Sequence, residues 1–387
     1  MSTNYDELTC WCALNTIFGY RPQVAKVLVD SLGSAQAIFN MDKVTMFTLL
    51  GPYNKYSDKI CTQSLDEAAE ELEKIQKQGY RFISRADPNF PALMNDCDDC
   101  PSGLYIRSNN PIKNIFGAPP YISIVGTRDM TPYGREWCQR IVKALSTCLE
   151  KPTIVSGLAM GVDITAHKTA IEYGLPTIAV LPTGIGDVYP TSHAKFADII
   201  CKAPGSALIT DYPSGTAPLA ITFVRRNRII AGMSSATILI ESKSRGGGMI
   251  TAKLASSYGR DVYALPGRAD DIRSQGCNLI IKNKTAEAIY NETGLLASLN
   301  LKGTYRPSRN NFKQIASSYQ GKISGDLIEI TADVLLTIKQ NRGIKTEEIA
   351  RLLMRDYKDI GTIVGMLEAD GFIETDLFQR CSISQKK

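Results

Sequence analysis

The chain has 387 residues, of which 44% are hydrophobic and 21% charged, a balance typical of soluble globular proteins with about two or three domains. It contains no run of roughly 18 to 20 apolar residues that could cross a membrane, and its first residues lack a signal-peptide pattern, so we expect a cytoplasmic protein. The net charge of +5 is uneven: residues 1–80 hold 7 basic and 10 acidic side chains, and residues 326–387 hold 9 and 11. The middle therefore carries +10, which predicts a polyanionic partner.

Residues 1–80 predict a small helical domain. Leu65, Ala68 and Leu72 recur at helical spacing, and Gly33 and Gly79 stand where helices are expected to end. We therefore place the first domain boundary near residue 80.

From residue 81 to residue 290 the pattern changes to short apolar runs separated by longer helical segments. The runs are rich in β-branched residues, as expected of strands buried on both faces. They are Tyr121–Val125, Thr153–Val155, Thr177–Leu181, Ala207–Thr210, Ala236–Ile240 and Asp261–Leu265. This alternation predicts an α/β fold, with a doubly wound, mainly parallel, Rossmann-like sheet.

Two further segments follow the predicted sheet. Residues 291–325 are rich in Gly, Ser, Asn and Lys, with five basic residues and no acidic one between Asn300 and Ser324, and predict a basic flexible linker. Residues 326–387 contain three short amphipathic helical patterns, at 328–340, 346–354 and 360–370, and then a turn and a short strand. Three helices and a β element in about 60 residues predict a winged-helix domain.

Glycine-rich segments follow four of the predicted strands. They are Gly126-Thr127-Arg128, Ser156–Gly161, Thr183–Gly186 and Ser244–Gly248. In an open parallel sheet, ligands bind beyond the carboxyl ends of the strands, and glycine-rich turns at helix N-termini offer backbone N–H groups to anions. One such loop is weak evidence because tight turns need glycine anyway, but four loops at one sheet edge predict an anion site.

The usual cofactor motifs are missing from these loops. The sequence has no Gly-x-Gly-x-x-Gly fingerprint after the first strand of the sheet and no P-loop, so neither a dinucleotide nor NTP hydrolysis is favoured. The tight cysteine pair Cys97-Asp-Asp-Cys100 has no second pair, and the chain has only two histidines. We therefore predict neither a cofactor nor a metal site.

The sharpest basic cluster is Arg225-Arg226-Asn-Arg228, within a helical pattern. Arg225 and Arg228 are three residues apart, so we expect them to share a helix face and to grip neighbouring phosphates, while Arg226 points elsewhere. A solvated surface is the alternative.

Three other residues near the expected anion site could have functional roles. A single histidine on a helix, such as His167, is more often packed than catalytic. Tyr189 and Phe223 could stack bases, although Phe223 suits core packing equally well.

The order of these motifs resembles the DNA-processing protein A (DprA/Smf) family, strongly over residues 80–285 and loosely in the flanking domains. The matching motifs are Phe90-Pro91-x-Leu93, Leu104-Tyr105, Ser123-Ile-Val-Gly-Thr-Arg128, Ser156-Gly-Leu-Ala, Gly161-Val-Asp163, Ala166-His167, Gly184-x-Gly186-x-x-Tyr189-Pro190, Phe223-x-x-Arg226-Asn-Arg-Ile-Ile-Ala-Gly232, Ile250-Thr-Ala252 and Ser274-Gln-Gly-Cys-Asn278.

The resemblance implies a non-enzymatic protein that binds single-stranded DNA, loads the RecA recombinase, acts in natural transformation (competence) and forms a homodimer through the Rossmann-like domain. It also implies an N-terminal SAM-like domain, related to helix-hairpin-helix folds, and a C-terminal winged helix. The implied DNA-contacting positions are Gly126, Thr127, Arg128, Ser156, Gly157, Arg226, Arg228 and Lys243.

Three positions depart from the family pattern. Met160 stands where some relatives carry lysine, and Val224 replaces a usual proline. Gly246, Gly247 and Gly248 replace a usual Ser-Gly-Ser, which removes two hydroxyl donors but keeps the backbone N–H groups available to DNA.

Two other functions remain as alternatives. A nucleotide-processing phosphoribohydrolase has a related sheet but needs a Pro-Gly-Gly-x-Gly-Thr loop beside a catalytic acid, and Arg245-Gly-Gly-Gly-Met-Ile lacks its proline and the following Thr-x-x-Glu. A winged-helix transcription factor is opposed by the −2 charge of residues 326–387, because phosphate contacts dominate duplex affinity.

Overall fold

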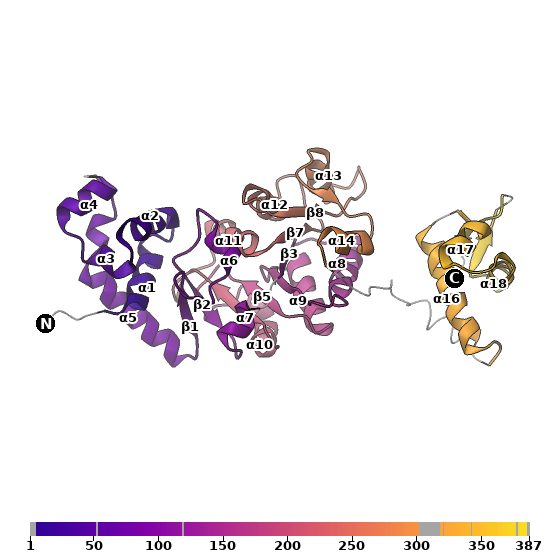
Figure 1. Cartoon of the computed structure of the whole chain (residues 1–387), viewed down its shortest axis with the longest axis horizontal. Helices are drawn as coiled ribbons and strands as arrows, with labels where there is room; N and C mark the ends of the chain where they lie inside the picture. The colour runs from indigo at the N-terminus through magenta and orange to yellow at the C-terminus, as the bar shows by residue number, and fades with distance from the viewer. Residues whose placement is uncertain are drawn as a thin grey trace. The chain divides into compact units, whose positions relative to one another are not determined.

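The computed structural model describes residues 5–51, 53–117, 120–301, 318–319, 321–341, 343–376 and 378–384. The chain divides into two compact units, Met1–Tyr305 and Arg306–Lys387, which are considered one at a time (Figure 1). Among the described residues, no helix combines the length and the apolar character that crossing a bilayer would require.

The first unit begins with five helices. They are α1 (Glu7–Ile17), α2 (Pro22–Leu32), α3 (Ala35–Phe39), α4 (Lys43–Leu50) and α5 (Thr62–Lys77). The carboxylate of Asp6 accepts a hydrogen bond from the Thr9 amide at 2.8 Å and caps α1, and Gly33 ends α2 with φ +86°. Leu14 and Phe18 belong to an apolar cluster that also contains Tyr105 of the sheet. The helices therefore share a core with the sheet.

A nine-stranded sheet forms the centre of this unit, counted over the described residues. Its strands are β1 (Arg81–Ser84), β2 (Gly103–Arg107), β3 (Tyr121–Val125), β4 (Thr153–Ser156), β5 (Thr177–Val180), β6 (Ala207–Thr210), β7 (Ala236–Leu239), β8 (Asp261–Ala264) and β9 (Glu287–Ala288), in the order β1-β2-β6-β5-β4-β3-β7-β8-β9. Strands β3 to β9 pair in parallel, and β1 and β2 extend one edge antiparallel. The large, mainly parallel sheet is confirmed, and all six predicted strands belong to it.

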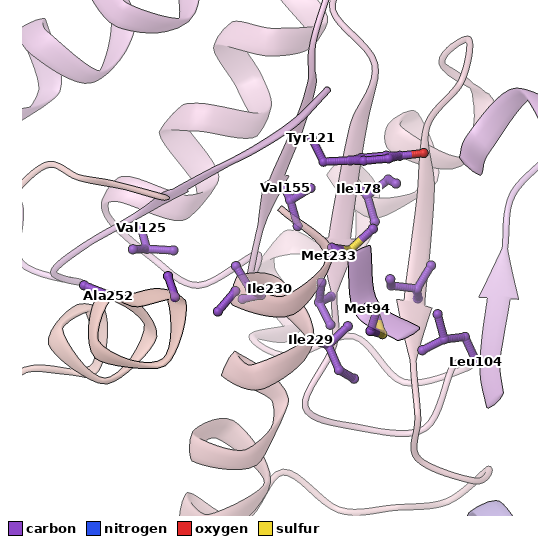
Figure 2. Close-up of a cluster of buried hydrophobic side chains, with 14 of the residues drawn as sticks. Met94, Leu104, Tyr121, Val125, Val155, Ile178, Ile229, Ile230, Met233 and Ala252 are labelled. Carbon is purple, nitrogen blue, oxygen red and sulfur yellow. The ribbon is translucent and has the colours of Figure 1, made fainter. Parts of the chain in front are cut away.

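Helices cover both faces of the sheet. They are α6 (Ala92–Asn95), α7 (Ile112–Phe116), α8 (Pro132–Leu145), α9 (Val162–Glu172), α10 (Ala194–Lys202), α11 (Ala220–Met233), α12 (Gly247–Ser257), α13 (Gln275–Lys282) and α14 (Glu292–Ser298). Because successive strand residues point to opposite faces, Val155 packs with Ile229 and Met233 of α11 (Figure 2). Ile154 packs in the cluster that contains α8 and α9.

The expected linker begins later than residue 291. Residues 292–298 form α14, which packs against α8, and its Leu295 and Leu296 are buried. Glu292 accepts a hydrogen bond from Arg140 at 2.5 Å. Apolar burial therefore assigns this stretch to the first unit, a correction to the predicted boundary. The rest of the predicted basic linker, at 302–317, lies outside the described residues.

The second unit contains α16 (Gly325–Gln340), β10 (Ile344–Lys345), α17 (Thr346–Leu353), α18 (Tyr357–Ala369), β11 (Ile373–Thr375) and β12 (Arg380–Ile383). Each of the three helical patterns coincides with a helix. The strands form an antiparallel sheet in the order β10-β12-β11. Val334, Ile349, Ile360 and Leu367 are part of its buried core.

Candidate nucleic-acid interface

The order of the parallel strands reverses between β3 and β7. The chain leaves β3 toward α8 on one face and leaves β7 toward α12 on the other, so the loops after these two strands flank the switch point. The first loop contains Gly126, Thr127 and Arg128, and the second runs from Glu241 to Gly248. Ligands of doubly wound sheets bind at this position.

The loops after β3, β4 and β7 pack directly against one another. A Cβ atom added at Gly248 would lie 3.1 Å from the Gly126 Cα, so one of the two backbones would have to shift by a few tenths of an ångström. Gly161, at the start of α9, has φ +79°, and a Cβ there would lie 2.3 Å from the Thr127 carbonyl oxygen. These three predicted loops are thus brought together at one edge, and their glycines permit the close approach.

Several backbone amides of the predicted anion-binding loops already donate hydrogen bonds to other groups of the protein. The Gly157 amide donates to the Asp163 carboxylate at 3.2 Å, and the Thr127 amide donates to the Glu241 carbonyl at 2.7 Å. The Ser156 hydroxyl is buried and donates to the Ile124 carbonyl at 2.6 Å. The loop after β4 is therefore no open anion site, because the chain's own carboxylate fills it.

Arg226 is buried beneath this loop. Its guanidinium donates to the carbonyls of Val180 and, at 2.8 Å, of Gly157, and so holds α11 to the ends of β4 and β5. Burial lowers the pKa of Arg226 to about 10, which leaves it charged at neutral pH. Burial also raises the pKa of Asp163, and the charge of Arg226 opposes this rise.

His167 lies deeper, with its Nδ1 2.7 Å from the Thr177 hydroxyl. Complete burial lowers the pKa of His167 to about 3, so the ring is neutral near pH 7. The structure supports the packed rather than the catalytic interpretation.

Arg225 and Arg228 do not form the predicted phosphate-gripping face. Arg228 is buried, pairs with the Asp211 carboxylate and donates to the carbonyl of Asp99. Arg225 is half-buried and donates to the carbonyls of Gly19 and Tyr20 rather than pointing into solvent. These two residues belong to the N-terminal helical segment, which comprises α1 to α5. The prediction failed because α11 is covered on several sides, which helical spacing alone does not reveal.

The cations that remain exposed at the switch point lie on the two flanking loops. Arg128 follows β3, and Lys243 and Arg245 follow β7. The Arg128 guanidinium lies 5.0 Å from the centre of the Phe223 ring, and Phe223 meets Tyr189 edge to face at 5.4 Å. Phe223 is half-buried and Tyr189 is exposed, so aromatic and cationic groups form one continuous surface.

The first turn of α12 adds unpaired helix amides to this surface. Gly246 is the N-cap, and Gly247 and Gly248 open the helix, where backbone N–H groups have no partner within the helix itself. The Gly246 amide already donates to the Lys243 carbonyl at 3.0 Å. Of the predicted glycine contacts, Gly247 is the exposed one and Gly248 is buried.

Glu241 was not anticipated from the sequence. Its buried carboxylate accepts hydrogen bonds from the Thr131 amide, at 2.9 Å, and from the Thr131 hydroxyl, and so orders the start of α8. The two residues are 110 positions apart, so no local sequence pattern links them. Within the described part of the chain, no group of three or more His, Cys, Asp or Glu side chains converges as a metal site would need.

A family model described as DNA recombination-mediator protein A matches residues 81–300, more than half of the chain. The chain belongs to this family. Membership assigns it to the DNA-processing proteins that mediate recombination.

Individual relatives agree with this assignment. Protein Smf of Synechocystis is 33% identical over 76% of this chain and 73% of its own length. DNA processing protein DprA of Streptococcus pneumoniae is 34% identical over 53% of this chain and 70% of its own.

Two solved structures share the fold. The DprA structure from Streptococcus pneumoniae superposes with a TM-score of 0.61 at 27% identity, covering 74% of this chain and 94% of that one. The DprA structure from Helicobacter pylori, which concerns a single-stranded DNA binding mode, superposes with a TM-score of 0.51 at 27% identity, covering 57% of this chain and 95% of that one.

Proposed function

We propose that this protein binds single-stranded DNA at the β3–β7 edge of the sheet and delivers it to a RecA-type recombinase in the cytoplasm, during natural transformation. The observation that carries the proposal is the Arg128–Phe223–Tyr189 group, flanked by exposed Lys243 and Arg245. The single-stranded DNA binding of the Helicobacter pylori relative supports it.

The geometry divides the predicted DNA-binding residues into two groups. Arg128, Lys243 and the first turn of α12 contact the DNA, because they are exposed or carry unused helix amides. A second group does not contact the DNA but supports the site, because its internal hydrogen bonds and ion pair hold the loops and α11 in place. It consists of Ser156, Gly157, Arg226 and Arg228. Gly126 and Thr127 have both roles: they are half-buried next to Arg128, so they support its loop and still have surface available to the DNA.

The preference for a single strand follows from the aromatic groups. Bases of a duplex are stacked inside the helix, whereas unpaired bases can lie against Phe223 and Tyr189 while Arg128 attracts the phosphates. Guanidinium and aromatic groups recognise the backbone and any base face, so little sequence dependence is expected.

The carboxylates beneath the loops support binding without catalysis. The Asp163 carboxylate accepts a hydrogen bond from the Gly157 amide and interacts with the charge of Arg226. The Glu241 carboxylate accepts hydrogen bonds from the amide and the hydroxyl of Thr131. A phosphoribohydrolase would need one of its acids exposed to the substrate, and both of these are buried. We therefore infer a non-enzymatic protein that uses neither a metal nor a cofactor.

The second unit and the dimer complete the proposal. Three helices with a small antiparallel sheet support a winged-helix domain, and the net charge of −2 carried by residues 326–387 favours contacts with protein over contacts with DNA. The N-terminal helices are proposed to form a SAM-like domain. We infer from the family resemblance that the Rossmann-like domain forms a homodimer, in which two DNA sites raise the avidity for one strand.

The test is fluorescence anisotropy with single- and double-stranded oligonucleotides of one sequence at two salt concentrations. We expect tighter binding to the single strand, with affinity falling steeply as salt rises. Arg128→Ala should weaken this binding roughly three- to tenfold, because it removes an exposed charge that faces a phosphate. Equal or tighter binding to the duplex would contradict the proposal.

A further inference from the structure

Tyr20 is an exposed aromatic residue that the structure holds in a defined orientation. It follows α1 and precedes α2, and 62% of its surface is accessible to solvent. The Arg225 guanidinium lies 4.4 Å from the centre of its ring, and donates to the Tyr20 carbonyl at 3.1 Å and to the Gly19 carbonyl. One side of the ring is thereby covered by a cation, while most of the side chain faces solvent.

Arg225 belongs to α11, the helix that also carries Phe223. Residues two positions apart on a helix point to opposite flanks, since each residue advances about 100°. The Arg225–Tyr20 pair and the Arg128–Phe223 pair therefore flank the same first turns of α11 on two sides. Between them, Ile221 and Val224 are exposed, at 49% and 43%.

The first turns of α11 combine positive charge with exposed apolar groups. Helix α11 contributes one residue to each of two arginine–aromatic pairs, and exposed apolar side chains of the same helix lie between them, beside the exposed cations of the switch point. Acidic groups would oppose a nucleic acid here, but from Leu219 to Met233 α11 contains no acidic residue. Positive charge combined with exposed rings and apolar groups suits a polyanion whose bases are unpaired.

We propose that Tyr20 is a base-stacking residue of the single-strand site, so that the strand leaves the Arg128 loop, crosses α11 and continues onto the N-terminal helical segment. The inference rests on the proposed function and deepens it. Arg225 then has two roles: it fixes the Tyr20 ring from one side and places a positive charge beside the base that stacks on the other. Ordering the ring before DNA arrives lowers the entropy lost on binding.

The experiment compares the unmodified full-length protein with Tyr20→Ala, Tyr20→Phe, Arg128→Ala and one control variant. The ligands are two fluorescein-labelled oligothymidines of about 6 and about 20 nucleotides, lengths that span the usual range of single-strand sites. Tyr20→Ala should weaken binding of the longer strand by about tenfold, within the range measured for removal of one base–aromatic stack. Binding of the shorter strand, which the Arg128 loop accommodates alone, should be unchanged. Tyr20→Phe, which keeps the ring, should bind both strands like the unmodified protein.

The matched control is Tyr53→Ala. Tyr53 belongs to the same helical segment and is fully exposed, so its removal tests whether any surface ring contributes. We expect no effect on either strand. Photocrosslinking of the unmodified protein to a 5-iodouracil oligonucleotide, followed by mass spectrometry, should mark Tyr20 without any substitution.

The outcomes separate this inference from the proposed function. If Arg128→Ala weakens binding while Tyr20→Ala binds the longer strand normally, the DNA site stands and the extended path is wrong; Tyr20 would then serve a protein partner. An equal loss on both strands for Tyr20→Ala, or a crosslink map that omits Tyr20, would also overturn it. Failure of the unmodified protein to bind either strand would instead reject the proposed function.

Discussion

The loops after β4 and after β7 look alike in the sequence but have different roles in the structure. Each is glycine-rich and each opens a helix. In the loop after β4, the Gly157 amide donates a hydrogen bond to Asp163, and the Gly157 carbonyl accepts one from Arg226. Internal groups of the protein therefore already occupy this loop's backbone. In the loop after β7, Lys243 and Arg245 stay exposed. The turn after β4 is therefore closed to an anion by the chain's own carboxylate, whereas the turn after β7 keeps exposed cations.

The largest effect should come from the buried cation under the β4 loop. Arg226→Met leaves Asp163 without its compensating charge and removes two hydrogen bonds to carbonyls, so we expect a loss of about 3–5 kcal/mol in the free energy of unfolding. Urea denaturation followed by circular dichroism measures it. Lys243→Met, in the exposed loop, is the control and should change stability by less than about 0.5 kcal/mol. A loss under about 1 kcal/mol for Arg226→Met would show that the two loops do not differ as described.

A smaller effect distinguishes two adjacent glycines within the β7 loop. Gly248→Ala would bring a Cβ to 2.8 Å from a Leu239 methyl group and 3.1 Å from the Gly126 Cα, so we expect a loss of about 1–3 kcal/mol from overpacking. Gly247→Ala meets nothing within 4 Å and should be neutral or slightly stabilising, because alanine favours helix. Thermal unfolding of both variants gives the comparison. Equal stability of the two would mean that the loops after β3 and β7 are not in close contact.

The smallest effect concerns DNA affinity through the exposed loop. The double variant Lys243→Ala/Arg245→Ala should lower single-strand affinity about three- to tenfold, because the two side chains are exposed and screened by salt. The slope of log affinity against log salt should also decrease by about 0.7 for each phosphate that the variant no longer neutralises. Lys253→Ala, an exposed lysine further along α12, should alter neither quantity. An unchanged slope in the double variant would exclude the β7 loop from the interface.

Local sequence patterns determined the architecture of the sheet domain. Apolar runs rich in β-branched residues, separated by helical segments, can pack only as a buried parallel sheet with helices on both faces, and all six predicted strands are present. The antiparallel strands β1 and β2 were missed, because a four- or five-residue run next to irregular segments carries no distinct periodic signal. The strands β10 and β12 of the second unit were missed for the same reason.

The sequence also determined which segments meet at the carboxyl edge of the sheet, since parallel strands bring their following loops together. It did not determine which side chains remain exposed there. Arg226 and Arg228 resembled surface cations, and only the packing of α11 against the sheet and against the turn at Asp99 showed them to be buried. The contacts that decided the roles of these arginines join residues 17 to 206 positions apart, as in Arg228–Asp211 and Arg225–Gly19. Burial and long-range pairing are properties of the folded chain, so tertiary structure alone separated the residues that are exposed at the proposed DNA site from those that hold the site in place.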